Sequence, residues 1–226
     1  MDKSTGDPLP DTKVELVGTD GSNYSTLSDA NGMFSFVENG KDRFIKENTS
    51  YSVRASHDQY LVVKDQVTTV GLKESTTFVK EYLLQPVVKP ISMPEVQFAL
   101  GSAELLPAGK DSLQTLYQTL IDNPTIIIEL AAHTDTRGSD KSNMTLSQNR
   151  AQSCVNYLIS KGIDPVRMVA KGYGETRPKI TDAEIAKMAT NEEKEAAHQK
   201  NRRVEFTVKS FNYVPKADST TPAPAN

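Results

Sequence analysis

The chain has 226 residues, of which 37% are hydrophobic and 24% are charged, and its formal net charge at pH 7 is −3. This composition is typical of a globular protein with one large or two ordinary domains, and it argues against a general nucleic-acid binder. No apolar run approaches the ~18 residues that are needed to cross a bilayer. A single cysteine, Cys154, excludes an internal disulfide and a multi-cysteine metal site.

Residues 12–85 consist of short alternating segments that are separated by turns. TKVELVG alternates Val14 and Leu16 with charged residues, and YSVRAS and TTFVKEYLL continue the period of two. SDANGMFSF places Asn31 and Gly32 ahead of two phenylalanines, a pattern that is typical of a β-hairpin. Because almost nothing here has helical periodicity, we expect a small all-β sandwich over residues 1–86.

Three prolines follow within the segment QPVVKPISMPEV, at Pro86, Pro90 and Pro94. Proline fixes φ and removes a backbone donor, so this segment predicts an extended, semi-rigid linker. We therefore place a domain boundary here, with the linker at residues 87–94 and a second domain at residues 95–211.

The second domain alternates strands and helices. PEVQFAL predicts a short strand, AGKDSLQTLYQTLIDNP a helix that ends at its Asn-Pro pair, and TIIIELAA a buried strand rich in β-branched residues. TLSQNRAQSCVNYLISKG predicts a helix that begins with a capping box of Thr145 and Gln148 and closes at Gly162. RMVAKGYGE predicts another strand with a turn.

The end of this domain carries two further capping boxes, Thr181 with Glu184 and Thr190 with Glu193, which predict two short helices. RRVEFTVKSF then predicts a last strand, and residues 212–226 have the composition of a disordered tail. Strands that alternate with helices in this way indicate an α/β or α+β sandwich, with helices packed on one face of a sheet.

The stretch AAHTDTRGSDKSNMTLSQNRA is the most polar part of the chain and is the candidate site. His133, Asp135 and Ser147 resemble the components of a catalytic triad, but no Gly-x-Ser-x-Gly elbow accompanies them, so catalysis is disfavoured. The remaining histidines, His57 and His198, form no i, i+4 pair with a second ligand, so a metal site is disfavoured too. We expect no cofactor.

A binding site explains more of this stretch. Asp135 ends the predicted central strand, and Arg150 lies in the helix that follows it. A carboxylate that only accepts hydrogen bonds and a bidentate guanidinium can together hold a zwitterion, with an ammonium at Asp135 and a carboxylate at Arg150. The alternative is an Asp135–Arg150 salt bridge that has a structural role and binds no ligand.

The first domain resembles the carboxypeptidase regulatory-like family of seven-stranded β-sandwiches. The resemblance rests on a Gly-x-Pro-Leu-Pro start followed by an Asp-x-x-Gly-x-Phe turn, here Asp29, Gly32 and Phe34. Members usually have one more strand before this start, so we expect the first strand to be missing here. The resemblance implies a structural or spacer module without catalysis.

The second domain resembles the OmpA-like C-terminal domain, a peptidoglycan-binding module, over roughly residues 94–210. The family pattern is Thr-Asp, a Gly three residues after that Asp, an Asn, Leu-Ser-x-x-Arg-Ala, Gly-x-Gly-Glu and Asn-Arg-Arg-Val. Every element is present, at Thr134, Asp135, Gly138, Asn143, Leu146, Ser147, Arg150, Ala151, Gly172, Gly174, Glu175, Asn201, Arg202, Arg203 and Val204. The resemblance implies an α+β βαβαβ-type sandwich, with helices packed on a mixed sheet.

This second resemblance also implies a function, which is non-covalent recognition of the diaminopimelate in the peptidoglycan stem peptide. Asp135 and Arg150 would be the principal ligand residues, and either Arg202 or Arg203 would lie nearby. The residues expected to assist them from the loop are Thr134, Thr136, Gly138 and Asn143. The first strand of the family often contributes an Asp or Asn, whereas FALGSAEL offers neither at the matching positions.

Residues 181–200 form a helical insertion that resembles a variant of Bacteroidetes members. In that group the same pair of domains ends longer outer-membrane lipoproteins, including components of the type IX secretion system. The resemblance therefore implies a periplasmic, outer-membrane-associated anchor without enzymatic activity, tethered to the membrane only through a region upstream of Met1. Further partners would be envelope or secretion-complex proteins. The alternative is an assembly module whose Asp–Arg pair is a structural salt bridge.

Overall fold

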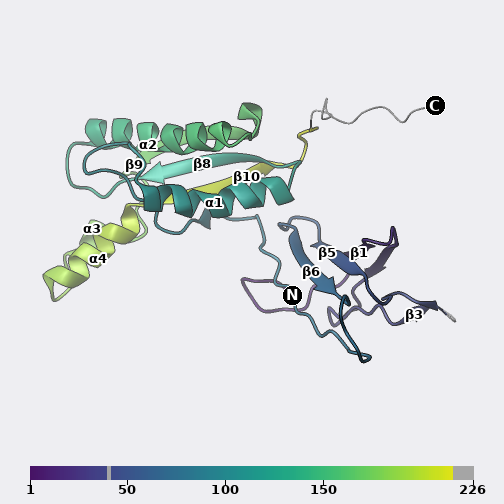
Figure 1. The fold of residues 1–226 in the computed structure, drawn as a ribbon. Helices are drawn as coiled ribbons and strands as arrows, with labels where there is room; N and C mark the ends of the chain where they lie inside the picture. Colours follow the sequence, from purple (N-terminus) through teal and green to yellow (C-terminus); the bar gives the residue numbers. More distant parts are fainter. Residues whose placement is uncertain (40–41, 216–226) are drawn as a thin grey trace, which may run out of the picture. The chain divides into compact units, whose positions relative to one another are not determined.

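The computed structural model describes residues 1–39 and 42–215. The chain divides into two compact units, Met1–Lys89 and Pro90–Asn226 (Figure 1). Most of the predicted disordered tail, residues 212–226, lies outside the described residues. Among the described residues, no helix combines the length and the apolar character that a membrane span requires.

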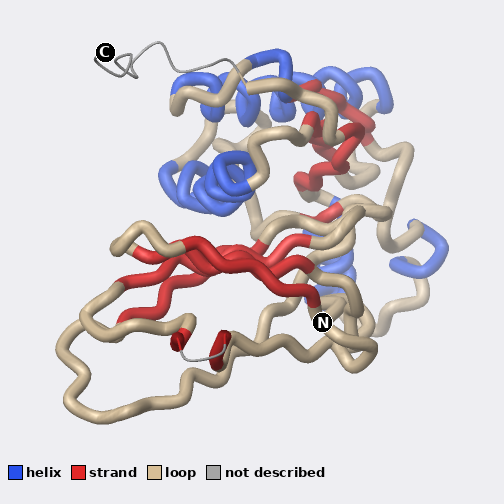
Figure 2. Tube along the Cα trace, turned by 90° about the vertical axis from the view of Figure 1, so that its right-hand side faces the viewer, coloured by secondary structure: helices blue, strands red, loops and turns tan. Residues whose placement is uncertain are grey.

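The first unit is built on one antiparallel sheet with the strand order β2-β1-β5-β6, which Figure 2 shows as a single twisted sheet. Its strands are β1 (Lys13–Gly18), β2 (Asn23–Leu27), β5 (Ser50–Ser56) and β6 (Val63–Thr68). A separate two-residue ladder joins β3 (Glu38–Asn39) to β4 (Asp42–Arg43). Alternate side chains of β1 and β5, among them Val14, Leu16, Tyr51 and Val53, form the buried core.

The predicted seven-stranded sandwich is not confirmed, because the described residues of this unit form a four-stranded sheet and a separate two-stranded one. TTFVKEYLL, which alternates like a strand, makes no ladder, and its only strand-like contact is an isolated bridge from Leu84 to Asp2. Instead its side chains contact Asp65 of β6, with Lys80 Nζ 3.0 Å and Tyr82 Oη 3.1 Å from the carboxylate. Residues 76–81 are exposed, so their alternation does not reflect burial, and the backbone at the end of the segment bonds to Met1 and Lys3 and not to a strand of the sheet.

The predicted hairpin at Asn31–Gly32 is a side-chain-capped loop and not a strand pair. The Asp29 carboxylate accepts hydrogen bonds from the backbone N–H groups of Asn31 and Met33, both at 2.8 Å. Gly32 has φ +71°, a conformation that favours glycine. Aspartate competes here with strand pairing for the backbone donors, which is the usual behaviour of this residue in turns.

The second unit contains a four-stranded mixed sheet with the order β7-β10-β8-β9. Its strands are β7 (Ile91–Ser92), β8 (Ile127–His133), β9 (Met168–Gly174) and β10 (Val204–Ser210). Only β8 and β9 are parallel, and a parallel pair needs a long crossover connection. Helix α2 (Asp140–Ser160) supplies it, and with α1 (Pro107–Asp122) it runs along the sheet (Figure 1).

Apolar side chains three and four residues apart hold the two helices against the sheet. Helix α1 buries Leu113, Leu116 and Leu120, which are each no more than 1% exposed. Helix α2 approaches β9 closely at Gly172, where an added Cβ would lie 2.2 Å from the backbone N of Gln148. This glycine therefore lets the first half of α2 pack against the ends of β8 and β9, where the candidate site lies.

Three boundaries differ from the sequence prediction. PEVQFAL forms only an isolated bridge between Phe98 and Leu105, and the edge strand is β7, inside the predicted linker. β7 stays two residues long because Pro90 and Pro94, which lack a backbone donor, flank it closely. Helix α2 begins at Asp140 with Ser139 as its cap, so Thr145 is an interior residue.

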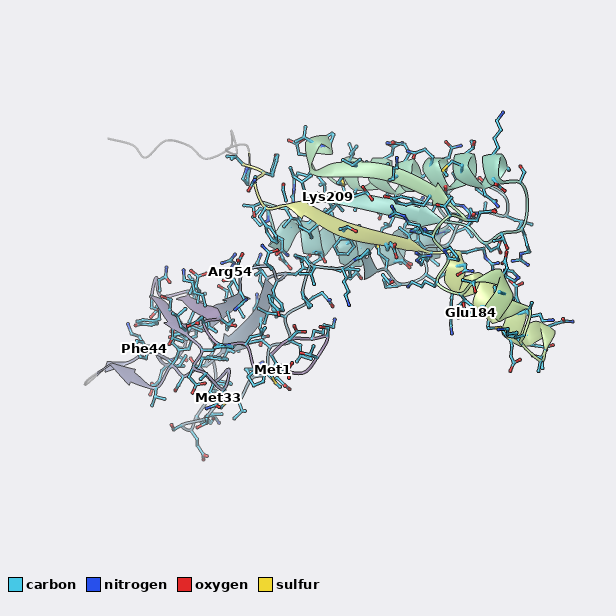
Figure 3. The ribbon with its side chains drawn as sticks, turned by 180° about the vertical axis from the view of Figure 1, so that it is seen from behind. Met1, Met33, Phe44, Arg54, Glu184 and Lys209 are labelled. Carbon is cyan, nitrogen blue, oxygen red and sulfur yellow. The ribbon has the colours of Figure 1, made fainter. Side chains whose placement is uncertain are left out.

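The two short helices near the end of the unit are confirmed, with both capping boxes formed. They are α3 (Asp182–Ile185) and α4 (Asn191–Asn201), and their caps are Thr181 and Thr190. Figure 3, in which Glu184 marks α3, shows the pair extending from one end of the sheet. They follow β9 and precede β10, so the chain passes through them before it returns to the sheet beside β8.

A buried arginine binds the backbone at the C-terminal end of α1. Arg167, in the single-turn helix η1 (Pro165–Arg167), donates to the carbonyl groups of Leu120, Asn123 and Ile126 at 2.7–3.1 Å. Carbonyls at a helix C-terminus lack partners within the helix. Arg167 therefore satisfies these groups and joins α1 to the start of β8 and β9.

Candidate functional site

The candidate site lies in the loop between β8 and α2, at the carboxyl ends of the two parallel strands. The loop is held from both sides: the Thr134 N–H donates to the Gly174 carbonyl at 2.9 Å. Asn143 in the first turn of α2 donates to the carbonyl groups of Asp135 and Arg137 at 3.2 and 3.3 Å, and to the Glu175 carboxylate at 2.6 Å. The backbone around Asp135 is thereby fixed.

The Asp135 carboxylate is surrounded by two arginines. Arg137 donates to it through Nε at 2.9 Å, Nη2 at 2.6 Å and its backbone N–H at 3.2 Å. Arg202 donates through Nη1 at 2.6 Å. Both arginines also bind Glu195 of α4, each with one contact at 2.8 Å. The four side chains thus form a closed circuit in which positive and negative charges alternate. We call Asp135, Arg137, Glu195 and Arg202 the Asp135 ring.

The ring keeps both of its carboxylates ionised. Burial opposes the charge on Asp135, but hydrogen bonds from Arg137 and Arg202 outweigh it, so the pKa of Asp135 lies below its usual value. Hydrogen bonds from the same two arginines lower the pKa of Glu195. Hydrogen bonds from Asp135 and Glu195 raise the pKa of Arg137. At neutral pH the ring therefore contains two anions and two cations.

Arg150, the predicted partner of Asp135, forms no ion pair with it in the described part of the chain. Its Nε donates to the Ser102 carbonyl at 2.9 Å, and its guanidinium lies 4.9 Å from the centre of the Phe98 ring. Burial, followed by the nearby charge of Arg202, lowers the pKa of Arg150, and the charge of Asp135 opposes this shift. The predicted structural Asp135–Arg150 salt bridge is thus wrong, because Arg137 and Arg202 occupy the carboxylate.

Arg202 and Arg203 are adjacent in sequence but bind different carboxylates. Arg203 Nε donates to Glu205 at 2.9 Å, and His133 Nε2 lies 3.1 Å from the same carboxylate. Burial opposes ionisation of Glu205, but hydrogen bonds from His133 and Arg203 lower its pKa to about 2. We call these three residues the Glu205 cluster. The structure therefore brings Arg202, and not Arg203, to Asp135.

The remaining predicted site residues have mainly structural contacts. Thr136 Oγ1 donates to Asp182 of α3 at 2.8 Å, and Gly138 adopts φ +112°, which favours glycine. Thr134 is 5% exposed, and its hydroxyl has no hydrogen-bond partner among the described residues. Asn143 donates to the loop backbone and Glu175, so its amide nitrogen stabilises the loop.

The side chains that resemble a catalytic triad have separate partners. His133 is bound to Glu205 and stacks on the ring of Tyr173, with 5.4 Å between the ring centres. Ser147 Oγ accepts the Gly174 N–H at 2.8 Å and donates to the Met144 carbonyl. No cluster of three or more potential metal-ligating side chains occurs in the described ranges.

Sequence reasoning missed three participants in the site. Arg137 stands between two residues that the pattern includes, and its position two residues after Asp135 was the available signal. Ser102 binds Arg150 through its backbone carbonyl, which any residue carries, so no side chain marked it. Glu195 is 60 positions from Asp135, and only the placement of α4 brings it to the ring.

Comparison with known proteins identifies the second unit. The sequence profile of the OmpA family matches residues 97–192. The second unit contains an OmpA-like domain. Outer membrane protein A of Shigella flexneri is 41% identical over 106 residues, which cover 41% of this chain and 30% of that protein. The probable lipoprotein YiaD of Escherichia coli is 36% identical over 119 residues, which cover 52% of this chain and 50% of that protein.

Solved structures also resemble part of the chain. The crystal structure of a putative MotB-like protein from Desulfovibrio vulgaris is 30% identical, with a TM-score of 0.41, and the match covers 50% of this chain and 67% of that one. The chain spans about a third of the length of the first curated relatives that it matches.

Proposed function

We propose that the OmpA-like domain binds peptidoglycan without transforming it, by recognising the diaminopimelate of the stem peptide. The observation that carries this proposal is the state of Arg150. Its side chain is half-buried, burial lowers the pKa of its guanidinium, and no carboxylate lies within ion-pair distance of it among the described residues. A desolvated guanidinium without an anion is strongly favoured to bind one, most effectively a planar carboxylate.

The charges around Arg150 fit a zwitterion. Arg137 and Arg202 are paired with the carboxylates of Asp135 and Glu195, so Arg150 is left without an ion-pair partner in the part of the chain that the structure describes. Diaminopimelate carries a carboxylate and an ammonium on one carbon at the free end of its side chain. Its carboxylate would bind Arg150, and its ammonium would bind the Asp135 carboxylate, which only accepts hydrogen bonds.

The expected location follows from the relatives. The matching curated proteins include outer membrane proteins and a probable lipoprotein, so we place this chain in the periplasm in association with the outer membrane. There the OmpA-like domain would anchor an envelope complex to the cell wall, as a binding module and not as an enzyme. The first unit, which resembles the carboxypeptidase regulatory-like family, would act as a spacer or contact partner proteins, such as type IX secretion components of Bacteroidetes.

Sedimentation of the protein with insoluble peptidoglycan tests this function. We expect the wild type to bind diaminopimelate-type peptidoglycan and to bind lysine-type peptidoglycan far less, because a lysine side chain lacks the carboxylate that Arg150 would hold. Arg150→Ala and Asp135→Asn should each weaken binding by about 2–5 kcal/mol. Arg177→Gln is the matched control, since it removes one exposed positive charge from the same unit without touching the Asp135 ring.

Two results would count against the proposal. One is equal binding of the two peptidoglycan types, and the other is a change below about 0.5 kcal/mol in both site variants, which is the range of neutral surface substitutions. If the wild type does not bind peptidoglycan at all, the alternative of a protein assembly module is favoured. One observation supports that alternative: the Asp135 carboxylate already has arginine partners inside the protein.

A further inference from the structure

Arg137 occupies the position around Asp135 that a ligand cation would need. Of the four hydrogen bonds that the Asp135 carboxylate accepts from the two arginines, three come from Arg137, and two of these come from its guanidinium. This guanidinium is a cation that binds the carboxylate, and the ammonium of a ligand would bind the same carboxylate. In the structure the ammonium position of the proposed site is therefore already filled by a side chain.

We propose that Arg137 is an internal competitor of the ligand ammonium, and that the site opens when Arg137 leaves Asp135. This inference rests on the proposed function, because it concerns how the same site admits diaminopimelate. It assigns to Arg137 a role in setting affinity and specificity, and it gives the α3–α4 segment an influence on binding through Glu195.

Exposure distinguishes Arg137 from Arg202 as the side chain that moves. The Arg137 side chain is 53% exposed, compared with 26% for Arg202 and 7% for Asp135. Arg137 also lies in a loop, next to Gly138, whereas the Arg202 backbone N–H is held by the His198 carbonyl at 3.0 Å at the end of α4. Rotation of the Arg137 side chain into water would leave the loop backbone and Arg202 in place.

Glu195 determines how firmly the competitor is held. It accepts a hydrogen bond from Arg137 Nη1 at 2.8 Å and another from Arg202 Nη2 at 2.8 Å. Its own side chain is 54% exposed, so solvent and salt weaken these contacts. The ring is thus strongest at buried Asp135 and weakest at its outer edge, which is the arrangement that lets Arg137 exchange with an incoming cation.

The competition reduces the apparent affinity by the fraction of molecules in which the site is closed. Arg137→Gln removes the competing cation while keeping a shorter, uncharged polar side chain. Asp135 would still be paired with Arg202, so its charge would not be left without a partner. We therefore expect this variant to bind the ligand more tightly than the wild type, whereas most substitutions near a binding site weaken it.

Titration calorimetry with a soluble diaminopimelate-containing stem tripeptide tests the inference on the full chain. We expect Arg137→Gln to lower Kd by about five- to ten-fold, which corresponds to a site closed in roughly 80–90% of the wild-type molecules. Arg177→Gln, the same change at an exposed arginine that stacks on Tyr173, should leave Kd within about two-fold of the wild type. Helical circular dichroism establishes that both variants are folded.

The outcomes separate the inference from the proposed function. If the wild type and Arg137→Gln bind equally, or the variant binds more weakly, the competitor role is overturned while the proposed function stands. If neither binds the tripeptide although both are folded, the proposed function fails and the inference fails with it. A tighter Arg137→Gln together with an unchanged Arg177→Gln supports both, and it excludes a general effect of net charge.

Discussion

Two of the buried carboxylates in the OmpA-like domain, Asp135 and Glu205, are each held by cationic or N–H-bearing side chains, and they differ in the exposure of those partners. In the Glu205 cluster the side chains of Glu205, Arg203 and His133 are 10%, 13% and 1% exposed. In the Asp135 ring the carboxylate is as buried as Glu205, but Arg137 and Glu195 are more than half exposed. The two groups share no residue, but Arg202 of the ring and Arg203 of the cluster are adjacent in the sequence.

This difference shows how burial decides what an ion pair does. A buried pair without access to water cannot exchange partners, and removal of one member leaves a charge that nothing else solvates. A buried carboxylate with an exposed partner can release that partner to water at small cost and accept another cation. The Glu205 cluster therefore stabilises the fold, and the Asp135 ring is suited to binding.

The largest effect that the comparison predicts is on stability. We expect Glu205→Ala to lower the free energy of unfolding by about 3–5 kcal/mol, because Arg203 and His133 would lose their buried carboxylate. Thermal unfolding followed by helical circular dichroism measures this in the second unit, since all described helices belong to it. Glu192→Ala, an exposed change on α4, is the control. A loss below about 1 kcal/mol would show that the cluster is not structural.

Acid should weaken the same cluster. The pKa of Glu205 is lowered from 4.5 to about 2 on folding, so its carboxylate contributes stability above pH 4.5 that is lost as the pH falls towards 2. The contribution is about 3 kcal/mol. Unfolding midpoints measured at several pH values between 5 and 2 should fall in the wild type. The fall should be smaller in Glu205→Gln, which cannot ionise at this position, and an equal fall would contradict the assignment.

The smallest of these stability effects concerns the ring. Asp135→Asn should lower the free energy of unfolding by only about 1 kcal/mol, because Arg137 and Arg202 both keep Glu195 as a partner. The same variant should lose most of its peptidoglycan binding. Its effect on binding is therefore large and its effect on stability small, whereas a structural residue has a large effect on stability. If its stability loss matched that of Glu205→Ala, the distinction between the two carboxylates would fail.

Local patterns predicted much of the second unit. The two capping boxes at Thr181 and Thr190 identified α3 and α4, because a cap is a contact between residues three apart and depends on little else. The β-branched run before His133 identified β8. The first unit was harder: TTFVKEYLL has the alternation of a strand but forms no ladder, and it is held by contacts with Asp65 and the first residues of the chain, which only the folded chain supplies.

The candidate site divides in the same way. Sequence by itself determined that Asp135 follows a buried strand in a polar loop and that Arg150 lies in the next helix, because both follow from short-range periodicity. Only the tertiary structure decided which arginine meets Asp135. The antiparallel register of β10 on β8 pairs Val204 with Ala132, which brings Arg202 beside a carboxylate 67 residues away. Periodicity places a residue on an element, but an ion pair depends on which elements become neighbours, and long-range packing determines that.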